Sequence, residues 1–151
     1  MLTAIGHRIR QAHRYVSMAA MAISVTPASG TDAAELAAIA ATTFPLACPP
    51  SAAAADVAAF IDTHLSAQRF EDYLSDPDRI VFCASDDAND DGRIVGYAML
   101  IRGVWRDRPA VELSKMYVSP SHHRTGAAAA LMQAGIAWAT ADGAEIGRAH
   151  V

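Results

Sequence analysis

The segment with the clearest chemical character runs from Glu112 to Gly143, where a short loop joins an expected strand to an expected helix. A helix that starts at Gly126 leaves its first backbone N–H groups without intrahelical partners, and its dipole adds partial positive charge there. Gly126 and the two alanines after it let a ligand approach the main chain, and His123 and Arg124 can add positive charge. This pattern indicates a phosphate or pyrophosphate site; an ordinary helix start that packs through small residues is the alternative.

Residue spacing excludes several other phosphate and metal sites. The helix start lacks the Gly-Lys-Ser/Thr of a Walker loop, and no Gly-x-Gly-x-x-Gly marks a dinucleotide turn. The acidic run Asp86–Gly92 lacks the spaced ligands and closing glutamate of an EF-hand, so we expect a solvated hairpin turn there. Neither a catalytic triad nor a group of metal ligands stands out, and we expect no bound metal.

Composition places the chain among globular proteins of one domain. It has 151 residues, 52% of them hydrophobic and 19% charged, and its 34 alanines supply helix propensity more than core. The net charge of −4 argues against non-specific nucleic-acid binding. No apolar run reaches the roughly 18 residues that span a membrane. Two cysteines, Cys48 and Cys83, are too few for a disulfide scaffold and favour a reducing, cytoplasmic location.

The first 21 residues differ in character from the rest of the chain. They contain Arg8, Arg10 and Arg14 and no acidic residue, and they lack the apolar core and cleavage site of a secretory signal. We interpret residues 1–21 as an N-terminal extension upstream of the true start at Met18 or Met21, with an ordered extra helix as the alternative.

Hydrophobic periodicity and turn residues predict a mixed α+β domain over residues 22–144. Thr31 or Asp32 should cap the first helix, and Phe44-Pro45 and Cys48-Pro49-Pro50 should end it. Turns are expected at residues 86–92 and 103–109. The expected elements are a strand at 22–28, helices from 32 to 44, at 51–65 and at 67–74, strands at 79–85, 93–102 and 110–118, and a helix at 126–141.

The strand, loop and helix around Gly126 resemble motif A of the GNAT N-acetyltransferase superfamily, whose core pattern is Arg/Gln-x-x-Gly-x-Gly/Ala. Here the motif is His123-Arg124-Thr125-Gly126-Ala127-Ala128, and the strand before it reads Leu113-Ser114-Lys115-Met116-Tyr117-Val118. The resemblance covers residues 22–143. It implies the GNAT fold, with a mostly antiparallel sheet flanked by helices, and acetyl-CoA as co-substrate.

The resemblance also implies which residues hold acetyl-CoA. The pantetheine arm should pair with main-chain groups of Met116, Tyr117 and Val118. The pyrophosphate should lie on the backbone N–H groups of His123, Arg124, Thr125, Gly126, Ala127 and Ala128. Two positions depart from the family: His123 replaces the usual Arg or Gln, and Arg124 replaces a common glycine, where it would either crowd the loop or pair with phosphate.

An amine acceptor must lose a proton before it attacks a thioester, and a carboxylate is a suitable base. Glu112 lies on the same strand, where some members of the family that the chain resembles keep such a glutamate. It is our candidate catalytic residue, with a surface ion pair as the alternative role. His122 is a second candidate, and Trp105 a candidate wall of the acceptor pocket. Core packing is the expected role of Tyr97 and Cys83, whereas Lys115 should face solvent or a partner side chain.

The family fold continues with a further strand, an Asn-bearing helix and a Tyr that serves as general acid. The sequence from Glu145 to Val151 does not match that pattern, and it resembles a translated sequencing adapter. We interpret residues 145–151 as an artefactual tail, with a natural short ending as the alternative. On this interpretation the fold lacks its last strands, the motif A strand becomes an exposed edge, and activity is impaired.

The sequence therefore predicts an N-acetyltransferase that moves acetyl from acetyl-CoA to a primary amine by direct attack in a ternary complex. A non-catalytic CoA-binding or interaction module is the alternative, and an unrelated phosphate-binding domain is a third hypothesis. The expected partner is a small-molecule or peptide amine, with no nucleic acid and no membrane, and a homodimer is allowed. The acceptor itself is left open.

Overall fold

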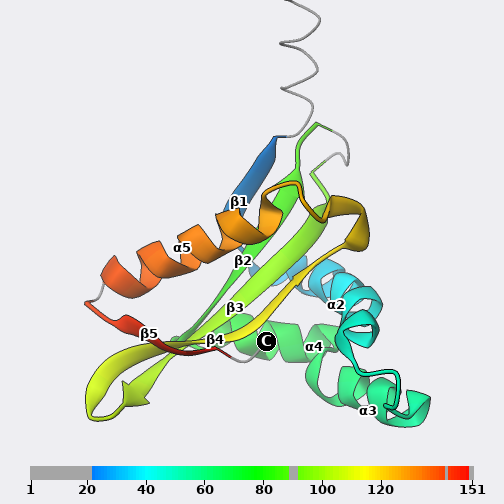
Figure 1. Cartoon of the computed structure of the whole chain (residues 1–151), viewed down its shortest axis with the longest axis horizontal. Helices are drawn as coiled ribbons and strands as arrows, with labels where there is room; N and C mark the ends of the chain where they lie inside the picture. The colour runs from blue at the N-terminus through cyan, green and yellow to red at the C-terminus, as the bar shows by residue number, and fades with distance from the viewer. Residues whose placement is uncertain (1–21, 89–91, 142, 150–151) are drawn as a thin grey trace, which may run out of the picture.

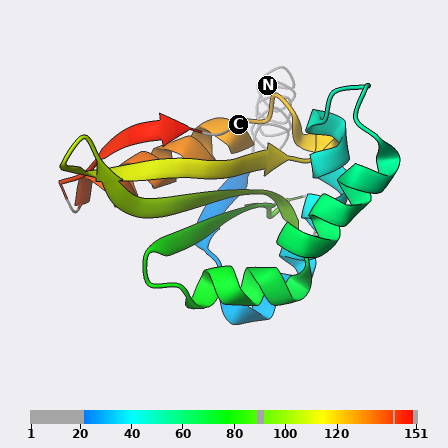
Figure 2. The same cartoon turned by 90° about the horizontal axis from the view of Figure 1, so that it is seen from below.

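The computed structural model describes residues 22–88, 92–141 and 143–149, with the last five as backbone alone. A single twisted sheet separates two layers of helices (Figure 1). Turned by 90°, the molecule shows helix α5 on one side of the sheet and helices α2 and α4 on the other (Figure 2). The predicted extension, residues 1–21, lies outside the described residues.

The sheet has five strands in the order β1-β2-β3-β4-β5. The first four pair antiparallel, and β5 is parallel to β4. This arrangement confirms the predicted α+β class. The strands are β1 Ile23–Pro27, β2 Arg79–Asp86, β3 Ile94–Trp105, β4 Arg108–Val118 and β5 Glu145–Ala149.

Each face of the sheet carries its own hydrophobic core. Helix α5, Ala127–Ala141, covers one face, where Leu100, Leu113 and Leu131 are almost completely buried. Gly135 allows this close packing, because a Cβ there would lie 2.9 Å from a methyl carbon of Leu100. Helices α2, Ala33–Ala47, and α4, Ala67–Ser75, cover the other face. Helix α3, Ala54–His64, buries none of its residues completely.

The two ends of α2 depart from the sequence expectation. Asp32 precedes the helix, but its carboxylate turns back to accept the Ser29 N–H at 2.8 Å, which closes a 3₁₀ turn at Gly30–Asp32. The helix also continues through Pro45 to Ala47, so the first predicted stop, Phe44-Pro45, does not end it, and it ends directly before the second, Cys48-Pro49-Pro50. Pro45 removes one N–H bond, only two helical residues follow it, and Phe44 stacks on Phe60 at 4.6 Å.

The predicted turn at residues 103–109 is also wrong, because β3 and β4 extend almost to the tip of their hairpin. Only Arg106 and Asp107 connect the strands, with φ values of 49° and 60°. Positive φ at both positions is what a two-residue hairpin requires, and Asn-Gly is its usual sequence signal. Arg-Asp carries no such signal, so the sequence suggested a longer loop.

Strand β4 is not the exposed edge that we predicted from the sequence. Strand β5 pairs with it over Ala110, Val111, Glu112 and Leu113. The backbone of residues 145–149 thus pairs with the first half of β4, at residues 110–113. The segment forms a strand even though it lacks the apolar pattern by which strands are recognised in a sequence. Whether residues 145–151 are an artefact stays a prediction.

Candidate active site

Strand β4 has two halves with different neighbours. The first half pairs with β5 as far as Leu113, and Ser114 is an extra residue in the ladder, because Met99 pairs with Lys115 and Leu100 with Leu113. A bulge of this kind bends a strand and redirects its side chains. In the described part of the chain, β4 from Ser114 onward has a strand neighbour on the β3 side alone.

The main chain of this second half faces the open edge at alternate residues. The Ser119 N–H donates to the Val95 carbonyl of β3 at 2.8 Å, which fixes the alternation. Met116 and Val118 therefore direct their N–H and C=O groups away from β3, as an extended ligand on this edge would require. The main chain of Tyr117 faces β3, and its ring packs edge-on against Phe44 at 6.3 Å.

The loop after β4 ends in a helix start with free backbone donors. The first N–H that bonds back within α5 is that of Ala130, to the Gly126 carbonyl at 2.9 Å. The N–H groups of residues 127–129 thus have no intrahelical partner. Thr125 closes the loop by donating its hydroxyl to the His122 carbonyl at 2.6 Å. A Cβ built at Gly126 would meet nothing within 4 Å, so the space beside these donors fits an anion such as pyrophosphate.

The two departures from motif A take up definite positions. Arg124 has an exposed side chain, and its backbone adopts φ = 64°, the left-handed conformation that glycine favours. This costs a non-glycine residue about 1 kcal/mol. His123 donates from Nε2 to the Val118 carbonyl at 3.0 Å, so its ring covers a main-chain group that we expected acetyl-CoA to use.

A second histidine anchors the loop to the sheet. His122 lies between Ser121, whose Oγ is 2.9 Å from Nδ1, and Asp86, whose Oδ2 is 3.3 Å from Nε2. The side chains of His122 and Asp86 are only 12% and 6% exposed. Sequence reasoning placed Asp86 in a solvated turn, but it ends strand β2 and is buried; nothing in a run of acidic residues marks its first member. His122 thus lies at the anion loop and not beside Glu112.

Glu112 lies in the part of β4 that pairs with β5, and its side chain is half-buried. It lines a hollow of about 120 Å³ whose other walls include Ile101, Ala110 and Trp105. Gly103 helps to form this hollow, and a Cβ there would meet nothing within 4 Å. The structure thus brings together the candidate base and Trp105, the predicted wall of the acceptor pocket.

Lys115 was expected to face solvent or a partner, and it is half-buried. Its Nζ lies 5.9 Å from the centre of the Phe60 ring. Burial lowers the pKa of the Lys115 ammonium; Arg79 lowers it further and Glu112 opposes the change. Arg79 and Glu112 therefore both lie close enough to Lys115 to act on the pKa of its ammonium. Sequence reasoning missed Arg79, which lies 33 positions before Glu112 and belongs to no motif.

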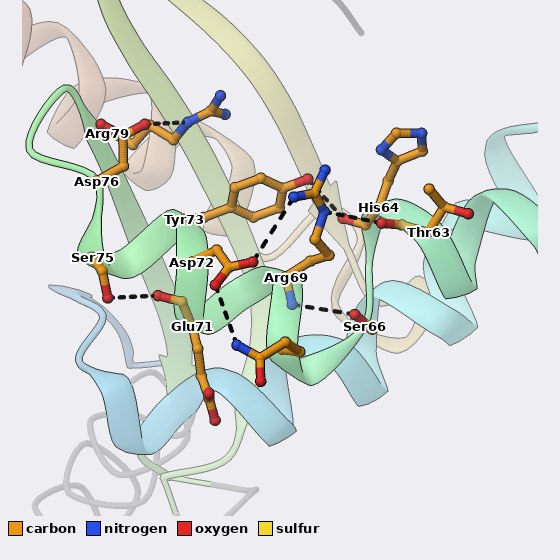
Figure 3. A network of polar contacts seen from close by, with 11 residues as sticks. Thr63, His64, Ser66, Arg69, Glu71, Asp72, Tyr73, Ser75, Asp76 and Arg79 are labelled. Atoms are coloured by element: carbon orange, nitrogen blue, oxygen red, sulfur yellow. Dashed lines mark hydrogen bonds and ion pairs between the residues drawn. The ribbon is translucent and has the colours of Figure 1, made fainter.

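A polar network on α4 fixes the position of Arg79 (Figure 3). Its Nε donates to Asp76 at 2.8 Å, and its guanidinium lies 5.0 Å from the centre of the Tyr73 ring. Hydrogen bonds from the Asp78 N–H and from Arg79 lower the pKa of Asp76. On the other side, the Tyr73 hydroxyl donates to the His64 carbonyl at 2.9 Å. Arg79 is therefore held in place at the start of β2.

Tyr97 and Cys83 belong to the core, as predicted. Tyr97 is completely buried, and its hydroxyl has no hydrogen-bond partner among the described residues. Burial raises the pKa of the Cys83 thiol to about 12, so it is not a nucleophile near neutral pH. Within residues 22–88, 92–141 and 143–149 there is no group of three or more potential metal ligands. No helix in this part of the chain is long and apolar enough to cross a membrane.

Known proteins share both the sequence and the fold. Residues 38–151 match the acetyltransferase (GNAT) family. Uncharacterized N-acetyltransferases of Mycobacterium tuberculosis and Mycobacterium bovis are 58% identical over 114 residues, which cover 76% of this chain and 69% of each relative. These matches show that the chain belongs to the GNAT family of acetyltransferases.

Solved structures agree on the fold. The PaiA N-acetyltransferase of Thermoplasma acidophilum, in complex with coenzyme A, has a TM-score of 0.64 at 15% identity, over 76% of this chain and 69% of that protein. An aminoglycoside N-acetyltransferase in complex with CoA has a TM-score of 0.63 at 20% identity, over 86% and 78% of the two chains. At these identities the likeness concerns the fold alone.

Proposed function

We propose that the chain transfers an acetyl group from acetyl-CoA to a primary amine by direct attack within a ternary complex. The observation that carries the proposal is that one strand, β4, directs the main-chain groups of Met116 and Val118 away from β3 and carries a half-buried carboxylate, Glu112, in its first half. The CoA complexes of structural neighbours support acetyl-CoA as donor. An enzyme of this kind must hold a thioester and a base side by side.

In this proposal the main chain holds the donor. Met116 and Val118 pair with the pantetheine arm, and the N–H groups of residues 124–128 receive the pyrophosphate. The N–H of His123, which we also predicted for this role, instead donates to the Pro120 carbonyl at 3.3 Å. The His123 ring leaves the Val118 carbonyl when the donor binds, because both need the same acceptor atom. Acetyl-CoA supplies an activated carbonyl carbon.

The chain's own side chains handle the amine. Glu112 accepts one proton from the ammonium, and the free amine then forms a bond to the carbonyl carbon. The carbon–sulfur bond breaks, CoA leaves as a thiolate, and the second proton of the attacking nitrogen passes to water. We assign no general acid among the described residues, so the thiolate takes its proton from water and turnover is slow. The acceptor is a small molecule or a peptide that bears a primary amine; a neighbour named for aminoglycosides supports the former.

The test measures acetyl-CoA binding by calorimetry and CoA release with a panel of amines. Glu112→Gln keeps the size of the side chain and removes the base, so kcat should fall about 100-fold while the Kd for acetyl-CoA stays within about twofold. Binding without transfer to any amine would favour a CoA-binding module, and unchanged kcat in the variant would remove Glu112 from the mechanism.

A further inference from the structure

We propose that the acceptor is an α-amino acid with an apolar side chain, whose amine meets Glu112 and whose carboxylate meets Arg79 and Lys115. The inference rests on the proposed function, because it concerns the acceptor of the same site. Three features carry it: a carboxylate, a pair of cations and an apolar hollow, which occupy neighbouring positions on the α2-and-α4 side of the sheet.

The register of the sheet aligns these groups. Arg79, Ile101 and Glu112 are successive partners across strands β2, β3 and β4. Neighbouring strands lie about 4.8 Å apart, which places the backbones of Arg79 and Glu112 about 10 Å apart. In the next row, Val81 pairs with Met99 and Met99 with Lys115.

The guanidinium of Arg79 reaches toward the strand position that carries Lys115. Nη1 of Arg79 reaches 4.0 Å from the sulfur of Met99, whose partner across the strands is Lys115. The guanidinium has five N–H donors, and Asp76 and Met99 receive two of them. Its planar fork suits a carboxylate, and the Lys115 ammonium adds a second positive charge beside it.

The electrostatic surroundings of Lys115 favour a bound anion. The ammonium is half-buried, and both its burial and the neighbouring guanidinium lower its pKa. An anion placed between Arg79 and Lys115 would reduce the repulsion between them and replace the water lost by the ammonium. Glu112 already acts on Lys115 as a negative charge, and the carboxylate of the acceptor would add a second one between the two cations.

The hollow beyond Glu112 receives the side chain. The side chains of Ile101, Ala110 and Trp105 line it on the face that carries Glu112, Arg102 also contributes to its wall, and Trp105 is 47% exposed at its rim. In an α-amino acid the amine, carboxylate and side chain leave one carbon atom in three directions. The sheet offers a carboxylate at Glu112, cations on one side of it and an apolar hollow on the other, which matches that geometry.

A polycationic acceptor fits this face poorly. An aminoglycoside whose first amine meets Glu112 would bring further ammonium groups toward Arg79 and Lys115, where like charges repel. The acceptor class proposed for this chain therefore differs from that of the aminoglycoside acetyltransferase with which it shares its fold.

The experiment compares L-leucine, L-leucinamide and kanamycin as acceptors of the full 151-residue chain, with CoA release as the readout. The kcat/KM for leucine should exceed that for leucinamide about tenfold, because only leucine has a carboxylate that can accept a charge-assisted hydrogen bond from the cations. The amide's ammonium is the more acidic, so amine reactivity alone favours leucinamide. Lys115→Met and Arg79→Met should each lower the value for leucine about tenfold and that for leucinamide less than about twofold.

Two control variants isolate the effect of charge at this position. Lys115→Arg keeps the positive charge and should keep the preference for leucine. Arg93→Met removes a cation beside the start of β3, at the other end of the strand from Trp105, and should leave both acceptors unchanged. Higher kcat/KM for leucinamide or kanamycin would overturn the acceptor assignment while leaving the transferase function intact.

Calorimetry with leucine in the presence of CoA separates this inference from the proposed function. If no amine is acetylated, but leucine binds and Lys115→Met weakens that binding about tenfold, the transferase proposal fails and the amino-acid site stands. Leucine that neither binds nor reacts would overturn the amino-acid site, whatever the chain does with other amines.

Discussion

The loop after β4 and the sheet face under α2 and α4 are built on opposite principles. The loop offers main-chain N–H groups, and its side chains either point to solvent, as Arg124 does, or hold the loop in place, as His122 does. The sheet face offers the side chains of Arg79, Glu112 and Lys115, drawn from two strands. A donor common to a family suits the first kind of site, and an acceptor that varies among members suits the second.

The largest expected effect comes from filling the space at Gly126. Gly126→Val places a β-branched side chain at φ = 88°, a conformation that such residues avoid, and puts methyl groups beside the free donors. We expect the Kd for acetyl-CoA to rise about 30-fold or more, by calorimetry. Leucine binding should persist. Loss of leucine binding in this variant would show that the acceptor face depends on the loop.

The anchor of the loop should have the next largest effect. Asp86→Asn weakens the buried acceptor of the His122 ring, so the free energy of unfolding should fall by about 1–3 kcal/mol and CoA affinity should fall with it. Asp87→Asn is the matched control, since Asp87 is the exposed neighbour and should change stability by less than about 0.5 kcal/mol. Urea unfolding and calorimetry measure both. Equal effects from the two variants would contradict a role for the His122–Asp86 contact.

Two tyrosine hydroxyls near the acceptor face should affect the free energy of unfolding in opposite directions. Tyr97→Phe removes a buried hydroxyl without a partner among the described residues and should raise the free energy of unfolding by about 1 kcal/mol. Tyr73→Phe removes the hydroxyl that donates to the His64 carbonyl and should lower it by about the same amount. Thermal and urea unfolding of both variants check the pair. Destabilisation by Tyr97→Phe would mean that its hydroxyl has a partner that the described residues do not show.

The two regions also differ in how far the sequence predicts them. The small residues after Thr125 and the strand–loop–helix order identify the loop, because the chemistry lies in consecutive backbone groups. The left-handed backbone of Arg124 and the burial of Asp86 were not predicted, because neither residue type indicates such a feature. Glu112 was found through the resemblance to the family.

The rest of the acceptor face could not be predicted from the sequence. The neighbours of Glu112 depend on the register of three strands and on the bulge at Ser114, which decide that Lys115 and Arg79 share its side of the sheet. A shift of one residue would send these side chains to the other face. The pairing of β5 was missed for a similar reason, because backbone hydrogen bonds hold it and its side-chain pattern does not identify it.

The smallest expected effect concerns the cost of keeping Lys115 on the acceptor face. Because the folded state lowers the pKa of Lys115 below its usual 10.5, the unfolded chain binds more protons between the two pKa values, and stability rises with pH across that interval. Below that interval Lys115 is charged in both states, and the full cost of holding its ammonium in the folded protein remains. Lys115→Met should therefore raise Tm slightly at pH 7, and the difference should shrink as the pH approaches 10.5. Thermal unfolding between pH 7 and 10.5 tests this, with Arg93→Met as the control variant. A variant that is more stable and yet poorer at using leucine would show that Lys115 is there for the acceptor. A lower Tm at pH 7 would instead assign the ammonium to the fold.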